Sequence, residues 1–141
     1  MTDAFDLQRF IDAQDAGGTY DQALAELRAG AKRSHWMWFV LPQLAGLGHS
    51  ATAQRYAVSG VEEARAYLAH AVLGARLREC AAALTALDTG DAVAVLGGID
   101  AQKLHSSMTL FAAVSDEPVF GAVLDQYFGG RPDRGTTALL S

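Results

Sequence analysis

Apolar residues recur at every third or fourth position along most of the chain, with polar residues between them. This spacing places the apolar side chains on one face of a helix, which has about 3.6 residues per turn. The first such stripe holds Phe5, Leu7, Phe10 and Ile11, and the two glycines at 17–18 should end that helix. Alternation with a period of two, which is typical of half-buried strands, is almost absent. The pattern therefore predicts an all-α protein.

The same reasoning divides the rest of the chain into short helical segments. We expect them over residues 19–30, 35–41, 50–57, 59–69, 73–87, 91–96, 100–111 and 118–128, before a last helical turn that packs Leu139 and Leu140. Residues 91–96 fit a strand or a helix, and their surroundings favour the helix. The side chains expected to cap helix starts are Ser34, Ser50, Asp100, and the capping boxes Thr19 with Gln22 and Ser59 with Glu62. No heptad is sustained, so we expect a compact irregular globule of about seven or eight short helices. One helical domain should cover residues 1–141.

The composition is typical of a folded domain. Half of the 141 residues are hydrophobic and 19% are charged, which provides enough apolar surface for a core. The acidic start MTDAFD lacks an apolar signal core, and the apolar run beside the tryptophans ends at Pro42, too early to span a membrane. Cys80 is the only cysteine, so the chain forms no internal disulfide. These features predict a soluble, cytoplasmic protein without a membrane partner.

Charge is distributed unevenly along the sequence. The formal net charge of −5 argues against a general nucleic-acid binder, whose affinity depends on neutralising phosphates. Residues 1–26 carry six acids against the single base Arg9, whereas residues 27–61 contain four bases and no acid. A local positive field on an acidic protein attracts a small anion without binding nucleic acid broadly. In the alternative interpretation, these bases pair with acids from other helices.

The stretch KRSHWMWFVLPQLAGLGHS, residues 32–50, holds both tryptophans and two of the four histidines. Its basic start coincides with an expected helix start, where free N–H groups and the helix dipole favour an anion. The tryptophans offer an aromatic wall for a base or a sugar, and a glutamine supplies both a donor and an acceptor. The candidate site residues in this stretch are Lys32, Arg33, Ser34, His35, Trp36, Trp38 and Gln43. Alternatively, both tryptophans belong to the core and the histidine bonds a neighbouring carbonyl.

A second candidate is the segment DAQKLHSSM, residues 100–108. On a helix, Lys103, Ser106 and Ser107 project from one side, next to apolar residues that face the core. Serine is not favoured in the middle of a helix, so these hydroxyls either bond a ligand or bond back to helix carbonyls. A serine–lysine dyad for acyl transfer is a third option, although no separate oxyanion element accompanies it. Asp100 is expected to cap the helix, or to act as a general base beside a ligand.

The sequence predicts neither a metal site nor a cofactor. His49, His70 and His105 lack the paired spacing of metal ligands, and Cys80 lies within an apolar helix stripe. The GGID stretch at 97–100 follows no strong strand, so it does not match a dinucleotide fingerprint.

Four stretches of the chain resemble a bacterial family of proteins. They are AELRAGAKRSHWMWFVLPQLAGLGHS, EARAYLAHAVLGARLREC, KLHSSMTLF and LDQYFGG. The family is the domain-of-unknown-function family eighteen-ten, whose members are often labelled calpastatin. The resemblance runs from about Phe5 to Leu140 and implies a compact, mainly α-helical single domain. The chain departs from the family at Ala71, where relatives usually have proline, and at His105, where arginine or another residue is commoner. We set the calpastatin label aside, because inhibitory calpastatin segments are disordered and this composition is globular.

Two functional hypotheses follow from these residues. In the first, the protein binds or transforms a nucleotide or ADP-ribose-type ligand, with Lys32, His35 and Lys103 holding phosphate and Asp100 assisting water. His35 and Asp100 are then the catalytic residues. The overall pattern resembles the helical NADAR-type N-glycosidases, which act on ADP-ribose derivatives, although none of their catalytic residues aligns here. In the second, the protein is a non-enzymatic protein–protein interaction module with a flat apolar patch around the tryptophans. The first hypothesis requires the two candidate segments to meet around a positively charged hollow.

Overall fold

The computed structural model describes residues 3–140. Over these residues the chain forms ten α-helices and one short 3-10 helix, and its only strand-like feature is one isolated bridge. The elements are α1 (Gln8–Asp15), η1 (Ala16–Gly18), α2 (Thr19–Ala29), α3 (Met37–Val40), α4 (Ala51–Arg55), α5 (Val61–Ala69), α6 (Leu73–Thr85), α7 (Ala92–Leu96), α8 (Gly98–Val114), α9 (Pro118–Phe128) and α10 (Arg134–Leu140). The all-α class is confirmed. None of the helices in this part of the chain combines the length and hydropathy needed to cross a bilayer.

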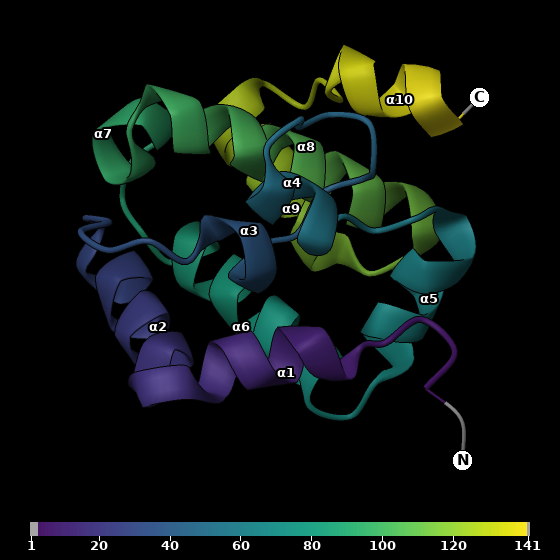
Figure 1. Ribbon diagram of the computed structural model, residues 1–141. Helices are drawn as coiled ribbons and strands as arrows, with labels where there is room; N and C mark the ends of the chain where they lie inside the picture. Colours follow the sequence, from purple (N-terminus) through teal and green to yellow (C-terminus); the bar gives the residue numbers. More distant parts are fainter. Residues whose placement is uncertain (1–2, 141) are drawn as a thin grey trace.

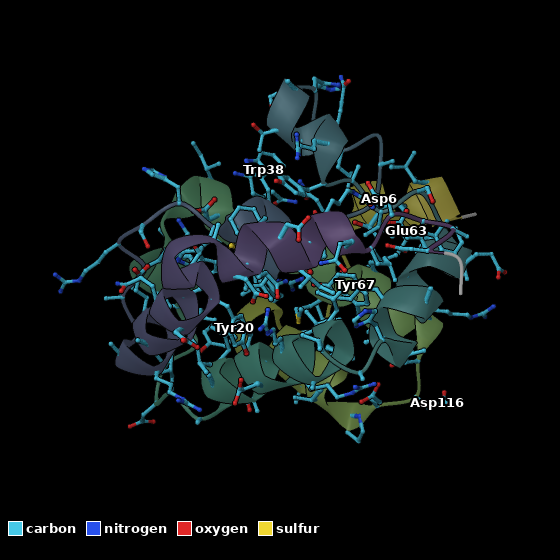
Figure 2. All side chains as sticks on the ribbon, turned by 60° about the horizontal axis from the view of Figure 1, so that its bottom comes forward. Asp6, Tyr20, Trp38, Glu63, Tyr67 and Asp116 are labelled. Carbon is cyan, nitrogen blue, oxygen red and sulfur yellow. The ribbon has the colours of Figure 1, made fainter. Side chains whose placement is uncertain are left out.

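The two longest helices, α8 and α6, organise the packing (Figure 1). Helix α8 contacts α5, α7, α9 and α10, whereas α6 contacts α2, α5 and α9. Aromatic rings connect these layers through the core: the ring centroid of Tyr67 lies 5.1 Å from that of Phe10 and 5.5 Å from that of Phe111. Figure 2 shows Tyr67 near the middle of the molecule, next to α1. Edge-to-face and tilted pairs of this kind add to the stabilisation that burial of the rings provides.

Helix bounds follow the apolar spacing well, but most of the expected caps are wrong. The Ser50 cap is confirmed, since its Oγ accepts a hydrogen bond from the backbone N–H of Ala53. Thr19 instead donates to the carbonyl of Ala16, and Ser34 donates to a side chain of α2. Helix α5 starts after Gly60, so it has no capping box from Ser59 and Glu62. A hydroxyl bonds the nearest strong acceptor in the folded chain, which local sequence does not specify.

The expected cap at Asp100 is also wrong, and the correction matters for the site. Helix α8 begins at Gly98, so Asp100 lies inside the first turn rather than before it. Its carboxylate pairs with two lysine side chains instead of the helix N–H groups. At the other end of the chain, Leu140 packs against the core as expected, but Leu139 remains about half exposed.

Two loops near the candidate segments are fixed by backbone hydrogen bonds. The loop after α2 is tied to α7, because the N–H of Lys32 donates to the carbonyl of Val95 over 2.8 Å. The loop between α3 and α4 is tied by the isolated bridge between Leu44 and Val58, in which Val58 N–H donates to the carbonyl of Gln43 over 2.9 Å. In Figure 1, α4 lies in front of α8. Lys32, in the loop after α2, reaches Asp100 of α8 over 2.8 Å. The two candidate segments of the sequence are therefore neighbours in space.

Candidate functional site

Both lysines of the chain form ion pairs with the carboxylate of Asp100. None of the nine arginines forms an ion pair with Asp100 among the residues that the structure describes. Lys32 Nζ lies 2.8 Å from Oδ2 of Asp100, and Lys103 Nζ lies 3.1 Å from Oδ1. Their side chains are 8% and 17% exposed, and that of Asp100 is 18% exposed. One carboxylate cannot balance two ammonium groups, so this cluster keeps a surplus positive charge. Because the cluster is largely buried, water screens that charge less than it would at the surface.

The lowered pKa of Asp100 keeps its carboxylate ionised at neutral pH. Burial alone would raise this pKa, but the hydrogen bonds and charges of Lys32 and Lys103 outweigh burial and hold the pKa below its usual range. The carboxylate therefore stays charged at neutral pH and keeps both ammonium groups in place.

Each lysine also lies over a tryptophan ring. Lys103 Nζ is 4.1 Å from the ring centroid of Trp38, and Lys32 Nζ is 5.1 Å from that of Trp36. An ammonium group over an indole face is attracted by the ring quadrupole. Trp36 is only 1% exposed and belongs to the core, as the alternative interpretation of the sequence has it. Trp38 is half-buried and lies near the periphery, close to α4 (Figure 2).

A hollow of about 290 Å³ opens above this cluster. Its lining includes Lys32, His35, Trp36, Trp38, Thr52, Asp100 and Lys103, so the core residue Trp36 also borders the hollow. We call it the cationic hollow. It combines two ammonium groups, an exposed imidazole, a hydroxyl and an aromatic wall, the mixture of apolar surface and few polar groups that is typical of small-molecule sites.

A second hollow of about 370 Å³ adjoins the first. Its lining includes Trp38, Gln43, Leu47, Ile99, Gln102, Lys103 and Ser106, and we call it the apolar hollow. Trp38 and Lys103 line both hollows, so the two spaces share a wall. Gln43 and Ser106, two candidates from the sequence, are thus brought to the same site as Lys103.

Three candidate residues lie elsewhere. Arg33 is exposed and lines neither hollow. Ser34 is engaged by a carboxylate of α2, to which its hydroxyl donates over 2.6 Å. Ser107 is fully buried in α8, lines neither hollow, and its hydroxyl has no hydrogen-bond partner within residues 3–140. The structure therefore supplies contacts for Ser34 other than a ligand and places Ser107 in the core.

Glu26 is the important residue that our sequence analysis did not single out. Although it is an acid, it is only 4% exposed. Its carboxylate accepts hydrogen bonds from the backbone N–H groups of Arg33 and Ser34, from Ser34 Oγ, from Trp36 Nε1 and from Gln22 Nε2, all within 3.0 Å. Burial alone would raise the pKa of Glu26, but these donors outweigh it and hold the pKa far below the usual range. Glu26 thus fixes the loop that carries Lys32 and His35.

We expect the stability of the protein to fall in acid. Glu26, Asp100 and Asp133 all have a lowered pKa in the folded chain. Such groups stabilise the fold above their unfolded pKa, and this stabilisation is lost as the pH falls towards the folded pKa. The free energy of unfolding should therefore be nearly constant from neutral pH to about pH 5 and decline below it. Urea titrations at stepwise pH would measure this decline.

The variant that checks this prediction is Glu26→Gln. It removes the carboxylate whose pKa is lowered far below its usual range in the folded chain. Its free energy of unfolding should be lower at neutral pH, and it should fall less steeply in acid than that of the wild type. Equal acid slopes for the two proteins would contradict the assignment of a lowered pKa to Glu26.

Comparisons with known proteins agree with the resemblance seen in the sequence. The family described as "Protein of unknown function (DUF1810)" matches residues 4–140. Among solved structures, the chain is similar to the conserved hypothetical protein Rv1873 from Mycobacterium tuberculosis, with 50% sequence identity, a TM-score of 0.94 and coverage of 98% of each chain. A search of curated proteins found no match. The chain belongs to the DUF1810 family.

Proposed function

We propose that the protein binds a small phosphate-bearing molecule of the nucleotide or ADP-ribose class in the cationic hollow. The observation that carries this proposal is the convergence of both lysines of the chain on Asp100. The cluster keeps one uncompensated positive charge, which a phosphate at the hollow would balance. Ammonium groups are effective point charges for phosphate.

A purely structural role explains this cluster less well. Burying charged groups costs free energy, and a buried ion pair is seldom better for stability than apolar residues of similar volume. A stabilising cluster would pair its charges one to one, whereas Lys32, Lys103 and Asp100 are unbalanced and border an open hollow. A binding site for an anion accounts for both the unbalanced charge and the open hollow beside it.

An N-glycosidase-like activity is the enzymatic form of this proposal. Asp100 is the acid among the residues that line the cationic hollow, and the exposed His35 lines it as well. In the free protein both oxygens of Asp100 accept from lysines, which makes the carboxylate a weak base. A phosphate that draws the lysines towards itself would release the carboxylate to accept a proton from a water that attacks the anomeric carbon of the ribose. The glycosidic C–N bond breaks in the same step, and its electron pair leaves with the nitrogen base.

The alternative function, a protein interaction module, has less support. It calls for exposed tryptophans on a flat patch, since aromatic anchors at interfaces bury themselves in the partner. Trp36 is 1% exposed and is held inside by its hydrogen bond to Glu26. The half-buried Trp38 is covered on one face by Lys103, in a hollow that also contains His35.

We expect millimolar ADP-ribose or AMP to raise the melting temperature by about 3 °C or more, because a ligand that binds only the folded state stabilises it. Lys103→Met keeps the side-chain length but removes the charge, and it should weaken binding about tenfold or more. Arg134→Met, which removes one exposed charge outside both hollows, should leave binding unchanged. No shift with any phosphate compound, or equal shifts in both variants, would refute the proposal.

Lysine acetylation gives a second measurement that needs no variant. Because the chain has only two lysines, any side-chain amine modification reports on the cluster itself. A bound phosphate should slow the acetylation of Lys103, followed by mass spectrometry, relative to the protein in buffer alone. Identical rates with and without saturating ligand would contradict binding at this place.

A further inference from the structure

The apolar hollow contains an exposed apolar residue that packing does not explain. Ile99 is 78% exposed in the first turn of α8, and together with Leu47 and Trp38 it lines this hollow. Isolated exposed apolar residues are ordinary, but here three apolar side chains line the same hollow, and this hollow adjoins the cationic hollow. The two hollows therefore differ in chemistry while sharing Trp38 and Lys103.

Gln43 is the polar residue of the apolar hollow whose side chain is unpaired. It is 8% exposed, and its carboxamide forms no hydrogen bond with any residue in the range 3–140. The neighbouring polar groups are already engaged: Gln102 Nε2 and Ser106 Oγ each donate to Asp133 over 2.9 Å. The carboxamide atoms are not fully enclosed, so they remain accessible from the hollow, and their donor and acceptor are free to bond a molecule that enters it.

The position of Gln43 is fixed by its main chain. Its carbonyl accepts from the N–H of Val58 over 2.9 Å, within the bridge that ties the loop down. The side chain therefore starts from a rigid backbone. Gln43 also borders a smaller hollow of about 120 Å³ next to α4. If a water in this smaller hollow bonds the carboxamide, Gln43 has no role in ligand binding, and Gln43→Leu should not change the affinity for AMP.

We infer that the apolar hollow is the subsite for the heterocyclic ring of the ligand, and that Gln43 recognises the hydrogen-bonding edge of that ring. This inference rests on the proposed function, since the phosphate of the same ligand would occupy the cationic hollow. A carboxamide offers one donor and one acceptor side by side, which match the paired acceptor and donor on the edge of adenine. Trp38 and the apolar side chains exclude water around the ring, and Lys103 stands between ring and phosphate.

The experiment compares AMP, adenosine and ribose 5-phosphate by isothermal titration calorimetry. Ribose 5-phosphate carries the phosphate without the ring, so AMP should bind at least about tenfold more tightly. In Gln43→Leu, which keeps the volume but removes the amide, affinity for AMP should fall about tenfold while affinity for ribose 5-phosphate stays unchanged. Gln8→Leu, the same replacement at an exposed position of α1, should change neither affinity.

A second variant avoids any question of folding. Ile99→Ser alters a surface residue of the apolar hollow and should lower the affinity for AMP severalfold without changing the affinity for ribose 5-phosphate. Val93→Ser, at an exposed residue outside the hollow, is the control and should change neither affinity. If ribose 5-phosphate binds as tightly as AMP, or if Gln43→Leu changes no affinity, the ring subsite is refuted while the phosphate site stands. If none of the three compounds binds, the proposed function itself fails.

Discussion

Replacing Glu26 by alanine is expected to lower the free energy of unfolding by about 3 kcal/mol or more, because several buried or partly buried donors lose their acceptor at once. The indole N–H of Trp36 and the backbone N–H groups of Arg33 and Ser34 all donate to this one carboxylate. Each unsatisfied buried donor costs about 1–3 kcal/mol, although water entering the space of the lost side chain offsets part of this. Urea-induced unfolding followed by tryptophan fluorescence would measure the loss and also report on Trp36.

The matched control is Glu62→Ala. Glu62 lies on α5 with an 83% exposed side chain, and its nearest partner is Arg65 at 3.9 Å. An exposed ion pair contributes little, so this variant should stay within about 0.5 kcal/mol of the wild type. If Glu26→Ala were equally mild, the loop would not depend on the carboxylate. Under conditions where Glu26→Ala still folds, it should bind phosphate compounds more weakly, since the loop that carries Lys32 is released.

The helices could be predicted from the sequence because each one buries an apolar stripe, and burial is what stabilises it. Helix α9 begins at Pro118 and ends at Phe128, as the spacing of Phe120, Val123, Leu124 and Tyr127 indicates. Caps were predicted less well, because they depend on single hydrogen bonds that compete with tertiary partners. Ser34 illustrates this: its hydroxyl bonds Glu26 of another helix in preference to the N–H groups beside it.

The site was predictable in part. Charge and aromatic residues picked out the two segments, and Lys32, Trp38, Asp100 and Lys103 do line one hollow. Their approach depends on how the loops pack against α8, which residue spacing does not determine. Two signals in the sequence were nevertheless available: the chain has only two lysines, and Glu26 follows Ala23 by three positions, on the buried face of α2. An acid on an apolar face implies buried donors nearby.

Arg9→Met should be the other strongly destabilising change, at about 3–5 kcal/mol, because it leaves a buried carboxylate without its counter-charge. Arg9 Nη2 lies 2.9 Å from Oε2 of Glu63, and the side chains are 13% and 3% exposed. The same guanidinium donates to the carbonyls of Arg55 and Ala57 over 2.8 and 2.9 Å. Figure 2 shows Glu63 beside the start of α1. Urea titration at neutral pH gives the free energy of unfolding directly.

A double-mutant cycle distinguishes the ion pair from the packing of the long arginine side chain. In Arg9→Met with Glu63→Gln, no buried charge remains unpaired, so the double variant should be about 1–3 kcal/mol more stable than the sum of the two single effects implies. Arg65→Met, at an exposed side chain, is the control for the loss of one positive charge and should cost little. Strict additivity in the cycle would mean that Arg9 acts through its carbonyl contacts alone. These contacts hold the end of α4, whose Thr52 lines the cationic hollow, so Arg9→Met should also weaken phosphate binding where the variant remains folded.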